Sequence, residues 1–358
     1  MGIFLEKNNY LYCFFLGSIG KGVRNLHGKP SRALRRFGVL AMALVLCSTA
    51  AMAAGKGEKR LVPVGHTVGV KLFSRGVVVV RLPEGGTPAR ACGLKIGDVI
   101  ETCGGQAVTS TEHFQSLLQE NGTAATELAV KRQGTPVTLS VEPERNEDGV
   151  CCIGAWIRDS MAGIGTVTYY DPDTNTFGAL GHGITDGDTA ALMPFGSGSI
   201  LPSTVKAVKK GTCGSAGELR GDFNLTEELG QLYANTGCGI FGTVNNTGLW
   251  TAGEALPVGQ AAAGPAVIRS NVSGDEVRDY EVEILKIIPD AADGREMVLS
   301  VTDPELIAAT GGIVQGMSGS PVIQNGRLVG AVTHVLLSAP TKGYGISVET
   351  MLETGSPV

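Results

Sequence analysis

The sequence has few aromatic residues and none of the short motifs that mark cofactor or metal sites. Aromatic residues make up 5% of the 358 residues, so a surface that stacks nucleic-acid bases is not expected. The net charge is −5 and no basic cluster occurs beyond the N-terminal segment, which argues against nucleic acid as a partner. No Walker loop, His-Glu-x-x-His or Cys-x-x-Cys motif is present. We therefore expect neither a cofactor nor a bound metal.

Cysteine usage gives little sign of a disulfide framework. Two of the eight cysteines, Cys13 and Cys47, lie near the N-terminus. The spacing of the other six fits no small disulfide scaffold, so free, partly buried thiols are favoured, although export would permit pairing.

Glycine, in contrast, is abundant. There are 52 glycines, and apolar residues make up 43% of the chain. This composition indicates a turn-rich, mainly β protein, and the length leaves room for about two domains and a tail.

The N-terminal region reads as a targeting segment rather than part of a globular domain. Residues 1–31 show no globular pattern and are interpreted as an unstructured extension. Three arginines between positions 32 and 36 precede an almost uncharged run over 37–54 that ends in Ala-Met-Ala. Residues 32–54 are therefore predicted to be a signal peptide or membrane anchor, with the rest of the chain exported. The pattern does not decide between cleavage and retention.

Residues 61–144 have the pattern of a small α+β domain. Apolar strands are expected at 68–72 and 76–80, joined by a Ser-Arg-Gly turn at 74–76. A helix over 109–118 with a Ser or Thr cap follows, and two short strands close the domain.

This segment resembles a PDZ domain. The resemblance rests on Pro-Ala-Arg-Ala-Cys-Gly-Leu at 88–94 and above all on Ile-Gly-Asp-Val-Ile at 96–100. PDZ domains bind extended peptides by adding a strand to a sheet edge. The resemblance implies a peptide groove opposite the helix that carries Phe114, formed by Thr67, Val68, Gly69, Val70 and Lys71. The usual Gly-Leu-Gly-Phe loop is replaced here, and a spacer with an empty groove is the alternative.

From residue 150 to 358 the chain consists of many short strands and turns without a long amphipathic helix. This pattern predicts a β-barrel or β-sandwich. Within it, residues 316–321 read Gly-Met-Ser-Gly-Ser-Pro. Glycines on both sides of a serine allow a tight turn that exposes the hydroxyl, so Ser318 is the candidate nucleophile. The N–H groups of Gly316 and Ser318 are the candidate oxyanion donors. Ser320 is the weaker alternative because a proline and a strand follow it directly.

The domain contains two candidate general bases. His182 lies between two glycines at a strand end, where a side chain can face a cleft. His334 lies within an apolar strand, as a hydrogen-bonded core histidine would. We favour His182 as the base.

The acid that would orient the base is less well defined. Asp303 lies fifteen residues before Ser318 (318 − 303 = 15), and His, Asp, Ser is a known order of triad residues. Asp186 and Asp188 are the competing candidates. Asp303 also precedes a proline and a short helix, so it could instead be a helix cap.

Several longer runs resemble the SpoIVB peptidases. They are the residues around the candidate serine, 311–321; two downstream segments, 331–335 and 340–346; and two upstream segments, 179–183 and 235–242. The resemblance implies a trypsin-like double β-barrel peptidase domain over 150–358 with a catalytic triad of His182, Asp303 and Ser318.

The resemblance also implies a biological role. Members of this family cut themselves and then cleave a regulatory protein that holds an intramembrane metalloprotease inactive. This releases sigma-factor processing during endospore formation, in the space between the forespore and mother-cell membranes. The alternatives are a quality-control protease of the HtrA type, in which the PDZ domain follows the peptidase domain, and a catalytically silent peptide-binding scaffold.

Overall fold

The computed structural model describes residues 58–245, 250, 253–289, 291 and 293–356. The segments expected to be an extension and a targeting sequence, 1–31 and 32–54, lie outside these residues. Within the described part of the chain, no helix combines the length and apolar character needed to cross a bilayer.

Six strands form a closed ring, here called barrel A. Their hydrogen-bonded order is β9-β10-β14-β13-β11-β2, and β2 pairs again with β9. The strands are β2 (Thr67–Arg81), β9 (Trp156–Asp171), β10 (Thr176–Ala179), β11 (Ser197–Lys209), β13 (Gly230–Thr236) and β14 (Gly239–Val244). Alternate residues of these strands, among them Val70, Val167, Phe177 and Ile200, fill the interior because successive side chains of a strand point to opposite faces. Two further strands, β1 (Arg60–Pro63) and β15 (Leu256–Pro257), extend the sheet beside β9.

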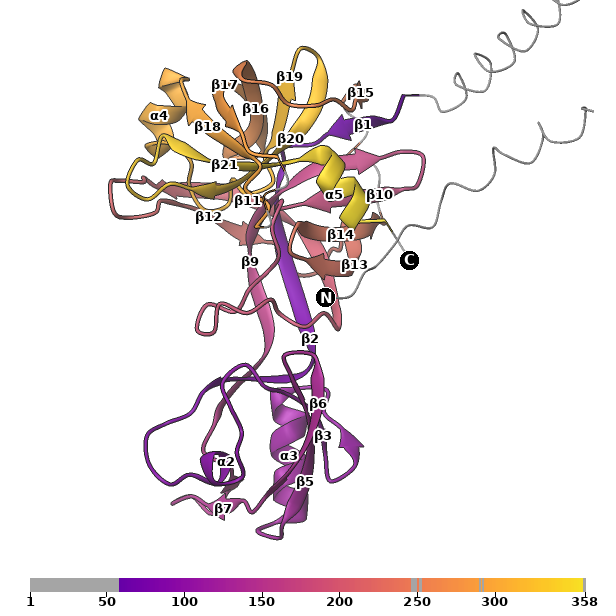
Figure 1. Cartoon of the computed structure of the whole chain (residues 1–358), viewed down its shortest axis with the longest axis vertical. Helices are drawn as coiled ribbons and strands as arrows, with labels where there is room; N and C mark the ends of the chain where they lie inside the picture. Colours follow the sequence, from indigo (N-terminus) through magenta and orange to yellow (C-terminus); the bar gives the residue numbers. More distant parts are fainter. Residues whose placement is uncertain (1–57, 246–249, 251–252, 290, 292, 357–358) are drawn as a thin grey trace, which may run out of the picture. The chain divides into compact units, whose positions relative to one another are not determined.

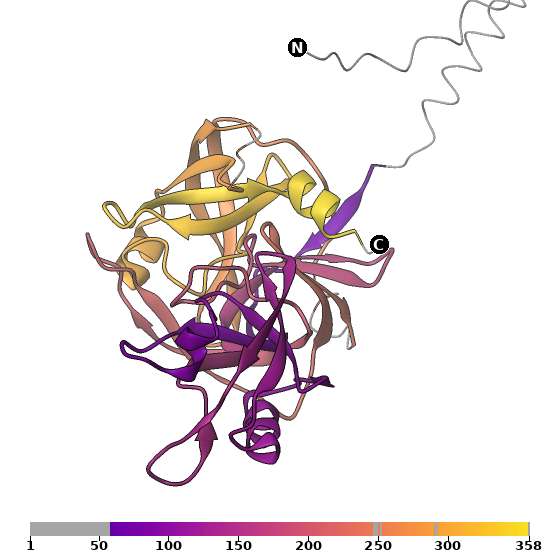
Figure 2. The ribbon, with the colours of Figure 1, turned by 60° about the horizontal axis from the view of Figure 1, so that its bottom comes forward.

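A second closed barrel of six strands, barrel B, follows in the chain and is drawn in orange and yellow in Figures 1 and 2. It consists of β16 (Gly264–Ser273), β17 (Glu276–Ile287), β18 (Met297–Val301), β19 (Pro321–Gln324), β20 (Arg327–Val335) and β21 (Lys342–Ser347). The helix α4 (Pro304–Thr310) lies between β18 and β19 in the chain. The expected mainly β architecture with a double barrel is therefore confirmed.

The two barrels share an apolar interface. Leu61, Tyr169 and Phe241 of the first sheet pack with Leu328 and Ile346 of barrel B. The C-terminal helix α5 (Val348–Thr354) contributes buried side chains to the same cluster. Strand β12 (Glu218–Phe223) pairs with β11 and also contacts the chain just before the candidate serine through a parallel bridge between Glu218 and Gln315.

The PDZ domain is inserted into barrel A rather than preceding it. Strand β2 is continuous where the sequence pattern predicts a turn at 74–76. Its residues 67–73 pair with β9 and β11 in the barrel, and Val77 and Val78 pair with β3 (Val99–Cys103) in the PDZ domain, as can be followed in Figure 1. Gly76 adopts φ +80°, a conformation that glycine tolerates and that accompanies the register shift between the two halves of the strand.

The longer helix of the PDZ domain supplies the largest side chains of its core. Phe114, Leu117 and Leu118 of α3 (Thr111–Asn121) are buried against Val77 and Val79 of β2. The remaining elements are α2 (Pro88–Ala91), β4 (Gln106–Ala107), β5 (Thr126–Arg132), β6 (Thr135–Val141), β7 (Glu144–Arg145) and β8 (Cys151–Cys152).

The peptide groove expected along residues 67–71 is not available there, and this expectation is corrected. Val68 pairs with Pro202 on one side and with Gly165 on the other, so both edges of this part of β2 are already hydrogen-bonded within barrel A. Inside the PDZ domain, the second edge of β2 pairs with residues 156–158 of β9. A peptide could therefore add to β2 only by displacing strands of the chain itself.

Candidate active site

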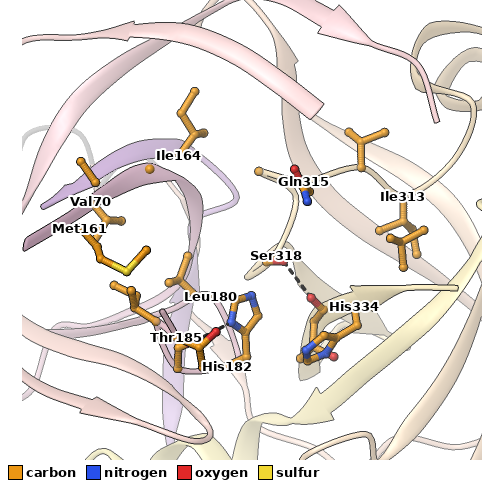
Figure 3. A pocket seen from close by; sticks show the side chains of 18 residues that line it. Val70, Met161, Ile164, Leu180, His182, Thr185, Ile313, Gln315, Ser318 and His334 are labelled. Carbon is orange, nitrogen blue, oxygen red and sulfur yellow. Dashed lines mark hydrogen bonds between the residues drawn. The ribbon is translucent and has the colours of Figure 1, made fainter. Parts of the chain in front are cut away.

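A pocket of about 390 Å³ lies where barrel A and barrel B face each other, and it contains Ser318, His182 and His334 (Figure 3). The nucleophile turn that precedes β19 contributes Ser318, the segment after β10 contributes His182, and the end of β20 contributes His334. Residues more than a hundred positions apart in the sequence thus meet at one site.

The turn that carries Ser318 is held by its own backbone and by a buried anchor. Gly316 and Gly319 adopt φ +99° and +97°, a region that favours glycine. Met317 between them is fully buried in the core of barrel B. The N–H of Gly319 donates to the carbonyl of Val332 at 2.7 Å, which ties the turn to β20. Ser318 remains only partly buried and faces the pocket.

Thr166 connects the nucleophile turn with the histidine segment, and no sequence signal identifies it. Its N–H donates to the Ser318 carbonyl at 2.9 Å, and its side-chain hydroxyl donates to the Gly316 carbonyl at 2.7 Å. Its own carbonyl accepts from the N–H of Leu180 at 3.1 Å. In sequence, Thr166 is one β-branched residue among several in a strand. Only the folded chain reveals that it positions both halves of the site.

The two N–H groups expected to bind an oxyanion have no acceptor among the described residues. The neighbouring amides are used: Met317 donates to Val314 at 3.1 Å and Ser320 donates to the Met317 carbonyl at 2.9 Å. The N–H groups of Gly316 and Ser318 are left without a partner in the described chain. Unpaired donors at a pocket are suited to hold the negative oxygen of a tetrahedral intermediate.

His182 is presented by an unusual stretch of backbone. Leu180 and Gly181 both adopt φ +68°, and for leucine this conformation carries a strain of about 1–3 kcal/mol. The strained residue is held in place by the hydrogen bond from its N–H to Thr166 and by burial of its side chain in the core of barrel A. The chain therefore leaves β10 sharply and turns the imidazole toward the pocket.

The hydrogen bond of the His182 ring defines its tautomer. Nδ1 lies 2.9 Å from the carbonyl oxygen of Gly183, which can only accept, so Nδ1 carries the proton and Nε2 is left as the basic nitrogen. Burial lowers the pKa of His182 below its usual 6.5, although the Gly183 hydrogen bond opposes this. A neutral imidazole with a free Nε2 is the form that a general base requires.

In this structure the Ser318 hydroxyl does not donate to His182. It donates to the carbonyl oxygen of Thr333 at 2.8 Å (Figure 3). The pairing of β20 with β21 shifts register between Val332 and His334, so Thr333 lies at a β-bulge. Bulges re-aim groups at the edges of active sites. A rotation about the Ser318 side chain is needed to bring its hydroxyl to a base.

His334 lies beside His182, with 5.1 Å between the ring centroids. Its Nδ1 is buried without a hydrogen-bond partner among the described residues. Burial, and then the positive charges that His182 and Arg295 can carry, lower the pKa of His334 to about 4, while the Asp293 carboxylate opposes them. His334 is therefore neutral at neutral pH.

Asp303 is not brought to either histidine. It caps α4, where one carboxylate oxygen accepts from the Leu306 N–H at 2.9 Å and the other accepts from the Glu281 N–H at 3.3 Å. Helix capping is the competing interpretation of this residue. In the described chain, no carboxylate is hydrogen-bonded to His182, and the Gly183 carbonyl occupies the position on Nδ1 that a triad acid would take.

The competing residues are engaged in other contacts. Asp186 forms an ion pair with Arg158, and Asp188 contacts the same guanidinium at 2.8 Å. Ser320 is fully buried and donates to the Ser270 hydroxyl at 3.0 Å. Ser318, in contrast, lines the pocket.

The chain matches two known protein families. A family described as SpoIVB peptidase S55 matches residues 149–352, and a PDZ domain family matches residues 79–132. No curated protein matches the chain.

Some solved structures resemble parts of the chain. The PDZ domain of the SdrC-like protein from Listeria monocytogenes is 19% identical, with a TM-score of 0.22, and the match covers 24% of this chain and 90% of that one. The corresponding domain from Listeria innocua is 24% identical, with a TM-score of 0.21, and the match covers 23% and 92%. The Rv3671c protease in its inactive form is 14% identical, with a TM-score of 0.28, and the match covers 55% and 85%.

The peptidase match extends over 204 residues (352 − 149 + 1), more than half of the 358-residue chain. It covers the segments that carry His182, His334 and Ser318. The protein is a serine endopeptidase with a PDZ domain and belongs to the SpoIVB peptidase S55 family.

Proposed function

We propose that Ser318 is the nucleophile of this peptidase and His182 its general base. His182 Nε2 accepts the Ser318 proton while the Ser318 oxygen attacks a peptide carbonyl. The oxygen of the tetrahedral intermediate is bound by the N–H groups of Gly316 and Ser318. His182 then donates the proton to the leaving amine, and a water activated in the same way releases the acyl group. The observation that carries the proposal is that a partly buried serine that faces the pocket, a neutral histidine and two unpaired N–H groups share one pocket.

We further propose that the protein is exported and cuts itself before it cleaves a membrane-associated regulatory protein. In this role it signals for sigma-factor processing during endospore formation, in the space between the forespore and mother-cell membranes. Family membership and the apolar run over 37–54 with its arginine flank support this proposal. The predicted partners are the chain itself, the regulatory protein of an intramembrane metalloprotease and the membrane, which the N-terminal segment contacts.

Self-cleavage is expected to occur before residue 58. Lys59 forms ion pairs with Asp171 and Asp173, and β1 (Arg60–Pro63) pairs with β9, so the chain over 59–63 is held against barrel A. A peptide bond must lie in an extended, accessible segment to enter a peptidase site. Mass spectrometry of the purified full chain should therefore find fragments of the wild type that begin at or before residue 58.

Matched serine variants test whether Ser318 makes these cuts. Ser318→Ala is expected to remain full length. Ser320→Ala is expected to yield the wild-type fragments, because the Ser320 hydroxyl is buried and hydrogen-bonded to the Ser270 hydroxyl. The same fragments in Ser318→Ala would show that this serine is not the nucleophile. Loss of cleavage in Ser320→Ala, with the fold retained, would shift the assignment to that residue.

Activity is expected to persist at pH values below the usual histidine pKa. Because burial holds the pKa of His182 under 6.5, its neutral form survives as the pH falls through 6.5, and activity is lost only when the pH passes the lowered pKa. His334 titrates at about 4 and does not contribute above that pH. A profile of kcat/KM against pH should place the acidic midpoint below 6.5. A midpoint at or above 6.5 would mean that the base is not the partly buried, neutral His182 described above.

Asp303 is expected to affect the helix α4 more than the chemistry. Asp303→Asn keeps an oxygen that can cap the helix and removes the negative charge, so kcat/KM should fall by less than about 10-fold. Asp303→Ala also removes the cap and should lower the free energy of unfolding by about 1 kcal/mol. Activity measurements with urea unfolding of both variants separate the two effects. A loss of about 10⁴-fold in Asp303→Asn with unchanged stability would instead identify Asp303 as the triad acid.

A further inference from the structure

Apart from its two histidines, which are neutral at neutral pH, the pocket around Ser318 has no acidic or basic side chain among the described residues. None of the described residues that line it is Asp, Glu, Lys or Arg. A peptidase that selects basic or acidic side chains needs an opposite charge at the point where the side chain ends, because an ion buried without a partner loses its hydration. This lining therefore indicates which side chains the substrate has beside the cleaved bond, and neither family match describes them.

Apolar residues form a wall on each side of the reacting groups. On one side of Ser318, Figure 3 shows Val70, Met161 and Leu180, which come from β2, β9 and the segment after β10. On the other side it shows Ile313, which precedes the nucleophile turn. Ser318 and His182 lie between these walls, so the pocket has two apolar lobes.

Both lobes are backed by packed cores and are not loose surface patches. Ile313 belongs to the core of barrel B, and Val335 packs against it. Val70 and Leu180 belong to the core of barrel A, and Met161 packs against a neighbouring apolar cluster. The walls can therefore exclude water without rearrangement, which is the condition for a side chain to gain free energy from burial.

The chemistry of the site assigns the two lobes to the two sides of the scissile bond. The oxyanion donors, Gly316 and Ser318, lie in the same segment of the chain as Ile313. The residue that supplies the attacked carbonyl therefore lies beside the barrel B lobe. His182 must protonate the departing nitrogen, so the residue that supplies this nitrogen lies toward barrel A and its lobe.

We infer that this enzyme cleaves peptide bonds flanked by apolar residues on both sides. The acyl-side residue (P1) is bound by the lobe of Ile313, Val314 and Val335, and the amine-side residue (P1′) by the lobe of Val70, Met161 and Leu180. The inference rests on the proposed role of Ser318. Leucine, methionine, valine or isoleucine at P1 gains burial, whereas aspartate or arginine loses hydration without a partner. The expected preference in kcat/KM is at least about 100-fold over a charged residue.

The test uses a synthetic peptide mixture in which every pair of amino acids occurs, with cut positions mapped by mass spectrometry. The full chain is compared with Ser318→Ala, and only cuts that need Ser318 are counted. We expect these cuts to fall between apolar residues. Ser318-dependent cuts that follow or precede charged residues would overturn the inference and leave the proposed function intact. Cuts that persist in Ser318→Ala, or no cuts at all, would contradict the proposed function itself, and the inference with it.

Two charged variants then test which lobe holds which residue. Val335→Asp places a carboxylate in the barrel B lobe and should shift P1 toward lysine and arginine while P1′ stays apolar. Met161→Asp should shift P1′ and leave P1 unchanged, so each variant is the control for the other. Val335→Thr has nearly the same shape without a charge and should not shift P1 toward lysine and arginine. A shift on the opposite side of the bond, or no shift in a variant whose Ser318 still reacts with a fluorophosphonate, would refute the assignment.

Discussion

His182→Ala is expected to lower kcat/KM by about 10⁴- to 10⁶-fold, the range seen when the base of a serine peptidase is removed. His182 is the histidine whose proton is fixed on Nδ1 by the Gly183 carbonyl, which leaves Nε2 free to accept the serine proton. Without it, the Ser318 hydroxyl has no base and is a weak nucleophile at neutral pH. The hydrolysis of a fluorogenic peptide, with the enzyme in excess over the peptide, gives kcat/KM for both proteins.

His334→Ala is the matched control because the two rings lie 5.1 Å apart in the same pocket. His334 has no hydrogen bond that would fix its tautomer, since its Nδ1 is unpartnered in the described chain. We expect a loss of no more than about 10-fold, attributable to a wall of the pocket becoming wider. If His334→Ala were the inactive variant and His182→Ala retained activity, the roles of the two histidines would have to be exchanged.

The contrast between the two histidines also shows how far the sequence can lead. The glycines around His182 and Ser318 are local signals, because a turn with positive φ can be read from neighbouring residues. The longer run at 311–321 also carries the resemblance to the SpoIVB peptidases. These local features are sufficient to predict the double barrel. They also single out Ser318 and His182, whose roles as nucleophile and base stay predictions.

Long-range contacts cannot be predicted in the same way. Thr166 positions Gly316, Ser318 and Leu180 through three hydrogen bonds, but a threonine in a strand is ordinary in sequence. Asp303 satisfies both the triad order and the helix-cap pattern, and only its contacts with Leu306 and Glu281 distinguish them.

The predicted position of the PDZ groove is wrong for a related reason. Residues 67–81 combine alternating apolar residues over 68–72 with a continuous valine run over 77–80, and neither pattern says which strands each half pairs with. Leu72 pairs with β9 and β11 in barrel A, whereas Val78 pairs with β3 in the PDZ domain. The position where one strand passes from one sheet to another depends on neighbours that are distant in the chain.

The second large effect is expected for Gly319→Ala, a change of one methyl group at the centre of the site. Gly319 adopts φ +97°, and a Cβ built on it would overlap the carbonyl oxygen of Thr166 and lie 2.5 Å from the amide nitrogen of Leu180. Both obstacles are backbone atoms, and they are the acceptor and the donor of the hydrogen bond between Thr166, which also holds the serine segment, and Leu180 of the histidine segment. The new methyl group must therefore push the two segments apart, and no rotamer change can relieve it.

Gly326→Ala is the control, because it shows how much stability is lost when alanine adopts a positive φ without a steric overlap. Gly326 adopts φ +72° in the turn between β19 and β20, and a Cβ there meets nothing within 4 Å. We expect it to lower the free energy of unfolding by about 1–2 kcal/mol with activity unchanged. Gly319→Ala should lower the free energy of unfolding by at least about 3 kcal/mol. Its kcat/KM should fall by more than about 100-fold even where the protein stays folded, because a displacement of the reacting groups lowers the rate by about this factor. Urea unfolding and fluorophosphonate labelling of Ser318 measure the two effects. If both variants lost the same stability and kept the same labelling rate, the close approach of Gly319 to Thr166 would not be what holds the serine and the histidine in register.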